Sequence, residues 1–138
     1  MIIAQRLVRR ICPKCRKQIE LPKETLKDIY NEIKKMPEKI SQERLKDRTE
    51  WDSVVKNKFY KGEGCAQCGG TGYSGRTAIL ETIDVTDEIK EIIMDESRIL
   101  KLEDVKENQV LISMKQDGVI KVMNGDTTFE EVLRVISR

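Results

Sequence analysis

The chain has 138 residues, of which 38% are hydrophobic and 36% are charged, and its formal net charge is only +2. A chain of this length can bury a hydrophobic core without disulfides. A net charge so close to zero gives no general attraction to nucleic acid or to anionic lipid, so no nucleic-acid partner is expected. The sequence contains no histidine, which excludes a histidine general base and every mixed Cys/His zinc site.

The amino terminus, MIIAQRLVRR, does not have the layout of a signal peptide. No apolar stretch approaches the length that crosses a bilayer. We therefore expect a cytoplasmic protein with no direct membrane insertion, in a reducing compartment where paired cysteines are more often metal ligands than disulfides.

The first half of the chain alternates strand and helix signals. Residues 4–15, AQRLVRRICPKC, predict a short strand that runs into a Cys-x-x-Cys turn. A helix is predicted over residues 21–36, because Pro22 suits a helix start, apolar side chains recur on one face, and Pro37 prevents continuation. The charged stretch at residues 38–52 is either a second helix or an exposed excursion. Its large apolar residues are Ile40, Leu45 and Trp51.

The glycine-rich stretch at residues 62–75 predicts a loop of tight turns, and the strand predicted after it runs from Thr77 to Ile83. Thr86 is a plausible cap for a helix, in which Ile89, Ile92 and Ile93 would share one face. The last helix is predicted from TTFEEVLRVISR, where Thr128 and Glu131 have the spacing of a capping box. Its expected apolar stripe consists of Phe129, Val132, Leu133 and Ile136.

Residues 109–124 have two interpretations. They can form a hairpin that turns at Asp117-Gly118 between β-branched residues, or a helix with one interior glycine. Periodicity alone favours the hairpin slightly. Gly118 itself is expected to be a turn or packing residue rather than part of a metal or phosphate loop. Glu130 and Glu131 are expected to be helix caps and surface charge.

The strongest functional signal is a pair of Cys-x-x-Cys motifs, formed by Cys12 and Cys15 and by Cys65 and Cys68. Four thiolates complete a tetrahedral zinc site and leave no open position for water, so the site is expected to be structural rather than catalytic. The 49 intervening residues, 16–64, only set the size of the loop that the metal closes. A dithiol redox pair and an iron or iron–sulfur site are the alternatives.

Two features around the cysteines have expected roles. Gly69 and Gly70 would leave backbone N–H groups free to approach the sulfurs. The negative charge of a four-thiolate zinc centre would be offset by nearby cations. These cations are Arg9, Arg10, Lys14, Arg16 and Lys17.

Together these motifs resemble the carboxyl-terminal part of the type II secretion and type IV pilus assembly ATPases, a family of hexameric RecA-like motors. The resemblance runs from Ala4 to Arg138 and rests on AQRLVR followed by CPKC, on GCAQCGGTGYSGRTAILE, and on QDGVIKVMNGDTTFEEVLRV. In that family AQRLVR lies at the end of the ATPase core, four cysteines hold a small zinc subdomain, and a helical domain follows. The resemblance also implies a helix rather than a hairpin for residues 109–124.

The resemblance implies an α+β fold with a small four-cysteine zinc subdomain containing short strands, followed by a mainly helical carboxyl-terminal domain. Residues 1–83 would comprise the end of the ATPase core and the zinc subdomain with its long charged insertion, and residues 84–138 the helical domain. No Walker A sequence is present, so we expect no ATPase activity, no catalytic residue and no nucleotide-binding residue in this chain.

The implied function is a structural zinc-binding and coupling module. Its implied partners are the ATPase core of the parent protein, neighbouring motor subunits and the inner-membrane platform proteins, so the chain would be peripheral to the inner membrane through these partners. By itself it is expected to be monomeric or weakly associated. The alternatives are an autonomous zinc module that binds nucleic acid or unfolded protein, since CAQCGGTG fits the CxxCxGxG repeat of DnaJ-type chaperones, and a thiol redox protein.

Overall fold

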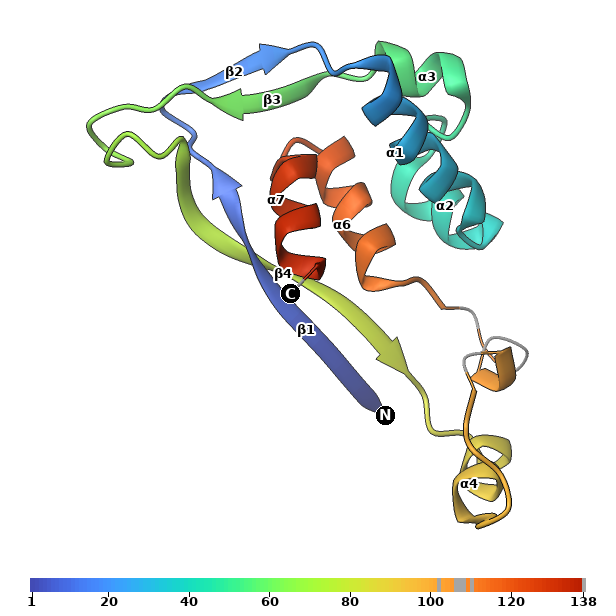
Figure 1. Cartoon of the computed structure of the whole chain (residues 1–138). Helices are drawn as coiled ribbons and strands as arrows, with labels where there is room; N and C mark the ends of the chain where they lie inside the picture. The colour runs from blue at the N-terminus through green and yellow to red at the C-terminus, as the bar shows by residue number, and fades with distance from the viewer. Residues whose placement is uncertain (102, 106–108, 110, 138) are drawn as a thin grey trace.

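The computed structural model describes residues 1–101, 103–105, 109 and 111–137. Within these ranges, two antiparallel two-stranded sheets combine with a set of short helices, as Figure 1 shows. The predicted α+β class is therefore confirmed. The main hydrophobic cluster includes residues from both sides of position 83, and the predicted domain boundary there stays a prediction.

The longest structural feature is a ribbon formed by β1 (Ile2–Ile11) and β4 (Tyr73–Ile83), which are antiparallel. Both strands were predicted, and β4 begins at Tyr73 rather than at Thr77. Val8 and Ile79 are fully buried on the side that faces the helices. Apolar side chains that remain exposed along the ribbon are Ile2, Ile3, Leu7 and Leu80.

The chain between the two cysteine pairs forms a second small sheet and three helices. β2 (Arg16–Ile19) pairs with β3 (Phe59–Gly62). The helices between these strands are α1 (Lys23–Lys35), α2 (Glu38–Leu45) and α3 (Trp51–Lys56). The prediction for residues 21–36 is confirmed, because α1 begins directly after Pro22 and ends before Pro37. The charged stretch that follows is helical over α2 and is anchored by Leu45, which is fully buried.

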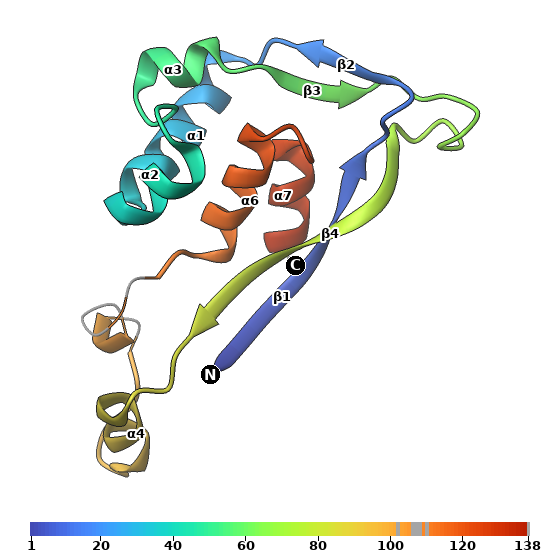
Figure 2. The same cartoon turned by 180° about the vertical axis from the view of Figure 1, so that it is seen from behind.

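The two last helices, α6 (Met114–Met123) and α7 (Phe129–Ile136), lie between the ribbon and the α1–α3 group in both views (Figures 1 and 2). They supply much of the main core, in which Ile120 and Val132 are fully buried. This position explains why the carboxyl-terminal stripe is apolar. Burying such a stripe against several elements is the main source of stability for short helices.

α6 settles the ambiguity at residues 109–124, since the hairpin interpretation is wrong and the helix implied by the family resemblance is present. The helix is shorter than that range, and residue 110 lies outside the described residues. Ser113 starts it with a full capping box: its hydroxyl accepts from the Gln116 backbone, and the Gln116 side chain accepts from the Ser113 backbone.

Asp117, one turn into α6, is buried and joins three elements. Its carboxylate accepts hydrogen bonds from Arg44 of α2 at 2.9 Å, from Lys121 of α6 at 2.7 Å and from the backbone N–H of Leu80 in β4 at 2.9 Å. Gly118 beside it is a packing glycine, because an added Cβ would lie 2.5 Å from a methyl carbon of Val132. The Asp-Gly pair is therefore not a turn. It joins α6 to α2, to β4 and to the neighbouring helix α7, and the α6–α7 pair is called the helix hairpin below.

α7 differs from its predicted amphipathic pattern in two ways. Thr128 caps it by accepting from the Glu131 backbone, but the Glu131 side chain is buried and turned to other partners, so the reciprocal half of the capping box is missing. Leu133, placed in the predicted apolar stripe, is 38% exposed, whereas Val135 is buried. The buried face is wider than the predicted stripe because α7 packs on both the ribbon and α6.

α4 (Asp87–Met94) stands at the far end of β4, apart from α1–α3, α6 and α7 (Figure 1). Thr86 caps it as predicted. Ile89 and Ile92 are buried, but Ile93, expected on the same face, is 53% exposed. Among the described residues, no helix is both long enough and apolar enough to span a membrane.

Candidate metal centre

The four cysteine sulfurs come together at the end of the β1–β4 ribbon. Cys12 and Cys15 lie in the turn between β1 and β2, and Cys65 and Cys68 lie in the loop between β3 and β4. All four sulfur atoms lie within 4.8 Å of one another. The Cys12 and Cys65 sulfurs are 3.8 Å apart, as are those of Cys15 and Cys68, and those of Cys65 and Cys68 are 3.6 Å apart. These separations are far longer than a disulfide bond, and all four cysteines are free.

The sulfur separations fit a tetrahedral metal site. A zinc–sulfur bond of about 2.3 Å places neighbouring sulfurs of a regular tetrahedron about 3.8 Å apart. Three of the separations, 3.6 to 3.8 Å, match that edge. Thiolate sulfur is the donor that favours zinc or iron over magnesium or calcium. Four protein donors would also leave no corner for a water molecule.

Backbone N–H groups surround the sulfurs. Cys15 accepts from the N–H of Gly64 at 3.3 Å, and Cys68 accepts from those of Cys65 at 3.2 Å and Gly72 at 3.3 Å. The prediction that Gly69 and Gly70 supply these donors was wrong. The amides of both residues donate to the carbonyls of Ala66 and Cys65, and their positive φ angles close the knuckle turn instead.

Burial and these amides shift the pKa values of Cys15 and Cys68 in opposite directions. Burial raises the pKa of Cys15 to about 12. Burial also acts to raise the pKa of Cys68, but the N–H groups of Cys65 and Gly72 outweigh it and lower that pKa to about 6. A thiolate that accepts backbone N–H bonds is stabilised in its charged form, which is the form that binds metal.

Three of the five cations expected to offset the centre's charge have other partners. Arg9 forms an ion pair with Glu131 and stacks on Tyr73. Arg16 stacks on Tyr60, and Lys17 forms an ion pair with Glu63. The sulfurs contact backbone amides, one another and the Cys65 carbonyl, so peptide dipoles are direct neighbours of the sulfurs.

The centre is hydrogen-bonded to the turn between α6 and α7. Immediately before Cys12, the Ile11 N–H donates to the carbonyl of Asp126 at 3.0 Å, and the Arg9 carbonyl accepts from the Thr127 hydroxyl at 2.8 Å. The Cys12 N–H donates to the carbonyl of Gly72. Gly125, in the same turn, has a positive φ and leaves room for Arg16 and Tyr60, which a Cβ would approach within 2.9 and 3.1 Å.

A buried carboxylate on α7 strengthens this connection. Glu131 accepts from the backbone and guanidinium of Arg9 and from the guanidinium of Arg134, at 2.6 to 3.1 Å. The bonds from Arg134, and then those from Arg9, outweigh burial and lower the pKa of Glu131 to about 2. Sequence reasoning assigned Glu131 to the surface, because its arginine partner on β1 lies 122 residues away.

The loop after the second cysteine pair contains GTGYSG at residues 70–75, which has the spacing GxGxxG. That spacing indicates a dinucleotide site only when a strand precedes it and a helix follows. Here the segment passes directly into β4. Its glycines serve the cysteine knuckle and the close approach of Gly72 to Gly62, where an added Cβ on Gly62 would meet the Gly72 carbonyl oxygen at 2.0 Å.

Comparison with known proteins places the four-cysteine arrangement in context. The family described as "Type II/IV secretion system protein" matches residues 1–134. The chain is 33% identical over 132 residues to the type IV pilus assembly ATPase PilB of Thermus thermophilus, covering 96% of this chain and 13% of that protein. It is 33% identical over 135 residues to PilB of Pseudomonas aeruginosa, covering 98% of this chain and 20% of that protein.

A relative named for secretion matches equally well. The type II secretion system protein E of Aeromonas hydrophila is 33% identical over 134 residues, covering 97% of this chain and 23% of that protein. The chain therefore spans less than a quarter of the length of each of these relatives.

Proposed function

Because this chain belongs to the type II/IV secretion system protein family, as the resemblance indicated, we propose that it is a structural zinc-binding and coupling module of a secretion or pilus assembly ATPase. Cys12, Cys15, Cys65 and Cys68 are the proposed zinc ligands. The observation that carries this proposal is the set of sulfur separations near 3.8 Å, which fits a closed tetrahedral site. A closed site stabilises structure and does not activate water.

The proposed coupling runs from the metal to the carboxyl-terminal helices. The metal would fix the end of β1 against the start of β4, and the bond from Ile11 to Asp126 would pass that constraint to the α6–α7 turn. The ion pair of Arg9 with Glu131 is a second link between the same elements. A displacement of β1 would then also move α6 and α7, because these bonds connect the strand to both helices.

The remaining parts of the proposal follow from the family. The module would have no ATPase activity by itself, and its partners would be the ATPase core of the parent protein, neighbouring subunits and inner-membrane platform proteins. Its location would be cytoplasmic, at the inner membrane through those partners. The relatives named as ATPases are much longer than this chain, which is consistent with the activity belonging to other parts of such proteins.

The test is a metal and thiol count on the purified chain. We expect one zinc per chain by elemental analysis, four thiols that resist alkylation before chelation, and four that react after it. Far-UV circular dichroism should change on chelation, because the metal closes the long loop between the cysteine pairs.

A matched pair of variants makes the test specific. Cys65→Ser should lower zinc content sharply, whereas Gln67→Ala, which changes an exposed residue inside the same knuckle, should leave it unchanged. A folded chain without metal, whose cysteines oxidise readily to two disulfides, would instead support a redox protein and reject the structural site.

A further inference from the structure

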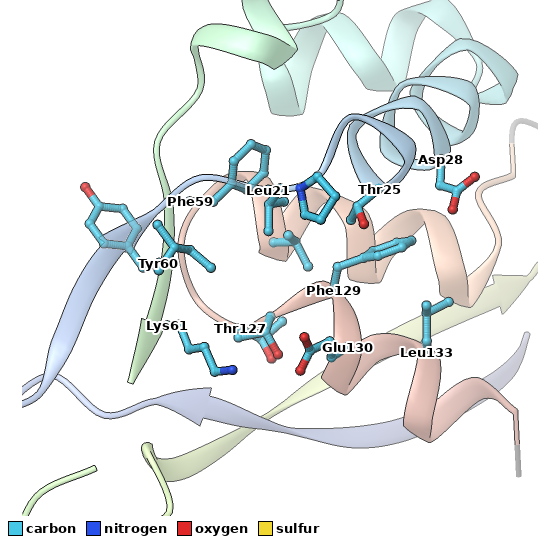
Figure 3. Close-up of a pocket in the computed structure, with 14 residues that line it drawn as sticks. Leu21, Thr25, Asp28, Phe59, Tyr60, Lys61, Thr127, Phe129, Glu130 and Leu133 are labelled. Atoms are coloured by element: carbon cyan, nitrogen blue, oxygen red, sulfur yellow. The ribbon is translucent and has the colours of Figure 1, made fainter. Parts of the chain in front are cut away.

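A groove opens on the side of the molecule between α1, the β2–β3 sheet and α7, and no cysteine lines it. Figure 3 shows its floor of apolar side chains, including Leu21, Phe59 and Phe129. Its volume is about 210 Å³. A cavity of roughly 150 Å³ already admits a benzene molecule, so this groove has room for an aliphatic side chain.

The rim of the groove carries charges of both signs. Asp28 of α1 and Glu130 of α7 are exposed carboxylates that line it, and in the view of Figure 3 Lys61 of β3 lies toward Glu130 and away from Asp28. An occupant with an apolar side chain and adjacent basic residues would match the floor and the two carboxylates. An acidic residue before the apolar one would match Lys61.

The same chain carries a segment with this chemistry. After α4 the sequence is Asp-Glu-Ser-Arg-Ile-Leu-Lys at residues 95–101. Ile99 is 84% exposed, more than any other large hydrophobic side chain among the described residues. Arg98 and Lys101 flank it, and Asp95 and Glu96 precede it.

The segment is held in a defined shape rather than left loose. Asp104 accepts from Arg98 and from the backbone N–H of Lys101 at 3.0 Å. Asp95 accepts from the backbone and hydroxyl of Ser97. These bonds fix both ends of a short loop with Ile99 projecting from it, and such preorganisation reduces the entropy lost on binding.

We propose that the groove receives the residue 95–101 loop of a second copy of this chain, with Ile99 on the apolar floor and its basic neighbours facing Asp28 and Glu130. Within one copy the loop cannot reach the groove, because α4 and the β2–β3 sheet lie at opposite ends of the molecule (Figures 1 and 2). The contact is therefore head to tail. Two different surfaces meet, and such contacts build rings or filaments rather than closed twofold dimers.

The contact is weak in the isolated chain, since one apolar side chain and a few screened charges form it. Neither surface contains a cysteine, and the test compares association among folded, zinc-loaded proteins, so its failure is distinguishable from failure of the proposed function. All proteins are used zinc-loaded, and circular dichroism confirms that each variant is folded.

The experiment is sedimentation velocity over a concentration series with two complementary variants. Ile99→Asp removes the loop's anchor and keeps the groove, while the double variant Asp28→Lys/Glu130→Lys reverses the groove rim and keeps the loop. We expect the sedimentation coefficient of the wild type to rise with concentration, and that of each variant alone to stay at the monomer value.

The decisive sample is an equal mixture of the two variants. Each variant has one intact surface and supplies what the other lacks. In the dimer that they form, the defective loop and the reversed rim are left unpaired at the two outer ends. The mixture should therefore form a one-to-one dimer that does not grow further. Val55→Asp changes an exposed apolar residue outside both surfaces and should associate as the wild type does.

Several outcomes would overturn the proposal. One is a wild type that remains monomeric up to about 1 mM, a concentration at which contacts of roughly 4 kcal/mol are half formed. Another is association of the single-surface variants as strong as that of the wild type. A third is a mixture that stays monomeric while the wild type associates. Loss of association in Val55→Asp as well would show general apolar stickiness and would also reject it.

Discussion

At Gly118 the backbone of α6 approaches α7 too closely for any side chain. An added Cβ would lie 2.5 and 3.0 Å from the two methyl carbons of Val132. Since Val132 is fully buried in the main core, it cannot turn away without displacing other core residues. The glycine is therefore fixed by packing, although alanine would be the better helix former.

Gly118→Ala should lower the free energy of unfolding by about 1–3 kcal/mol, the usual cost of overpacking a core, despite the gain in helix propensity. Urea denaturation of the zinc-loaded chain measures this change. The double variant Gly118→Ala/Val132→Ala should be less destabilised than the sum of the single variants, because the second change removes the methyl groups that clash. Additive effects would contradict the close contact.

Glu131 is the other residue whose role depends on distant partners. Its folded-state pKa of about 2 lies well below the ordinary glutamate value of 4.5. A depressed carboxyl pKa contributes stability that is present above the unfolded value and lost as the pH falls through the folded value. The relevant window is therefore between about pH 4.5 and pH 2.

Glu131→Gln should lower the free energy of unfolding by about 1–3 kcal/mol at neutral pH, because the half-exposed arginines lose their charged acceptor. The difference from the wild type should shrink as the pH falls through the window just given, since the wild-type carboxylate is then protonated too. Comparing the two proteins cancels the acid-induced loss of metal, which both share. Glu130→Gln, on the exposed face of the same helix, should stay within about 0.5 kcal/mol of the wild type.

At the scale of elements, Asp117 holds α2, α6 and β4 together. The strand contributes a backbone N–H and the two helices contribute side-chain cations. α2 belongs to the charged segment between the cysteine pairs, so this carboxylate is one of the polar links that anchor that segment to the rest of the fold. Leu45 provides the apolar anchor beside it.

Asp117→Asn should destabilise the chain by about 1–3 kcal/mol, because a buried amide cannot accept charge-assisted bonds on both of its terminal atoms. The measurement is urea denaturation in a double-mutant cycle with Arg44→Met. A coupling energy of at least about 0.5 kcal/mol is expected if the two side chains interact. A cycle that closes to zero would mean that the ion pair contributes nothing and that the bond to Leu80 carries the effect.

At the scale of the whole molecule, the cysteine centre and the carboxyl-terminal helices share one hydrogen-bonded framework. β1 ends at the first cysteine pair, β4 begins after the second, and the α6–α7 turn bonds to the residues just before Cys12. α4 projects from the other end of β4 (Figure 1). Loss of the proposed zinc should therefore affect the α6–α7 helix pair and not α4.

Chelating the metal should accelerate amide hydrogen exchange at Ile11 and at Gly125 and Asp126, since the ordered end of β1 holds that turn in place. Exchange in α4 should stay unchanged and serves as the internal control. If acceleration were confined to residues 64–72, the centre would stabilise only its own loop and the coupling proposal would fail.

The sequence by itself determined the features that depend on local chemistry. The spacing within each cysteine pair, the prolines around α1 and the threonine caps of α4 and α7 each act within a few residues, so they could be identified without the fold. The tertiary structure brought the two cysteine pairs to one point, and it alone paired β2 with β3 and buried Asp117 and Glu131.

The physical reason is the sequence separation of the deciding contacts. Residues 114–123 satisfy the signals of both a helix and a hairpin, and only the assembled fold shows that Gly118 lies in a helix, where its backbone packs against Val132. Glu131 has the local pattern of a surface carboxylate, and only the strand that carries Arg9 gives it buried partners 122 residues away. Local propensity is a weak term that packing overrides, so these positions were decided by the assembled fold.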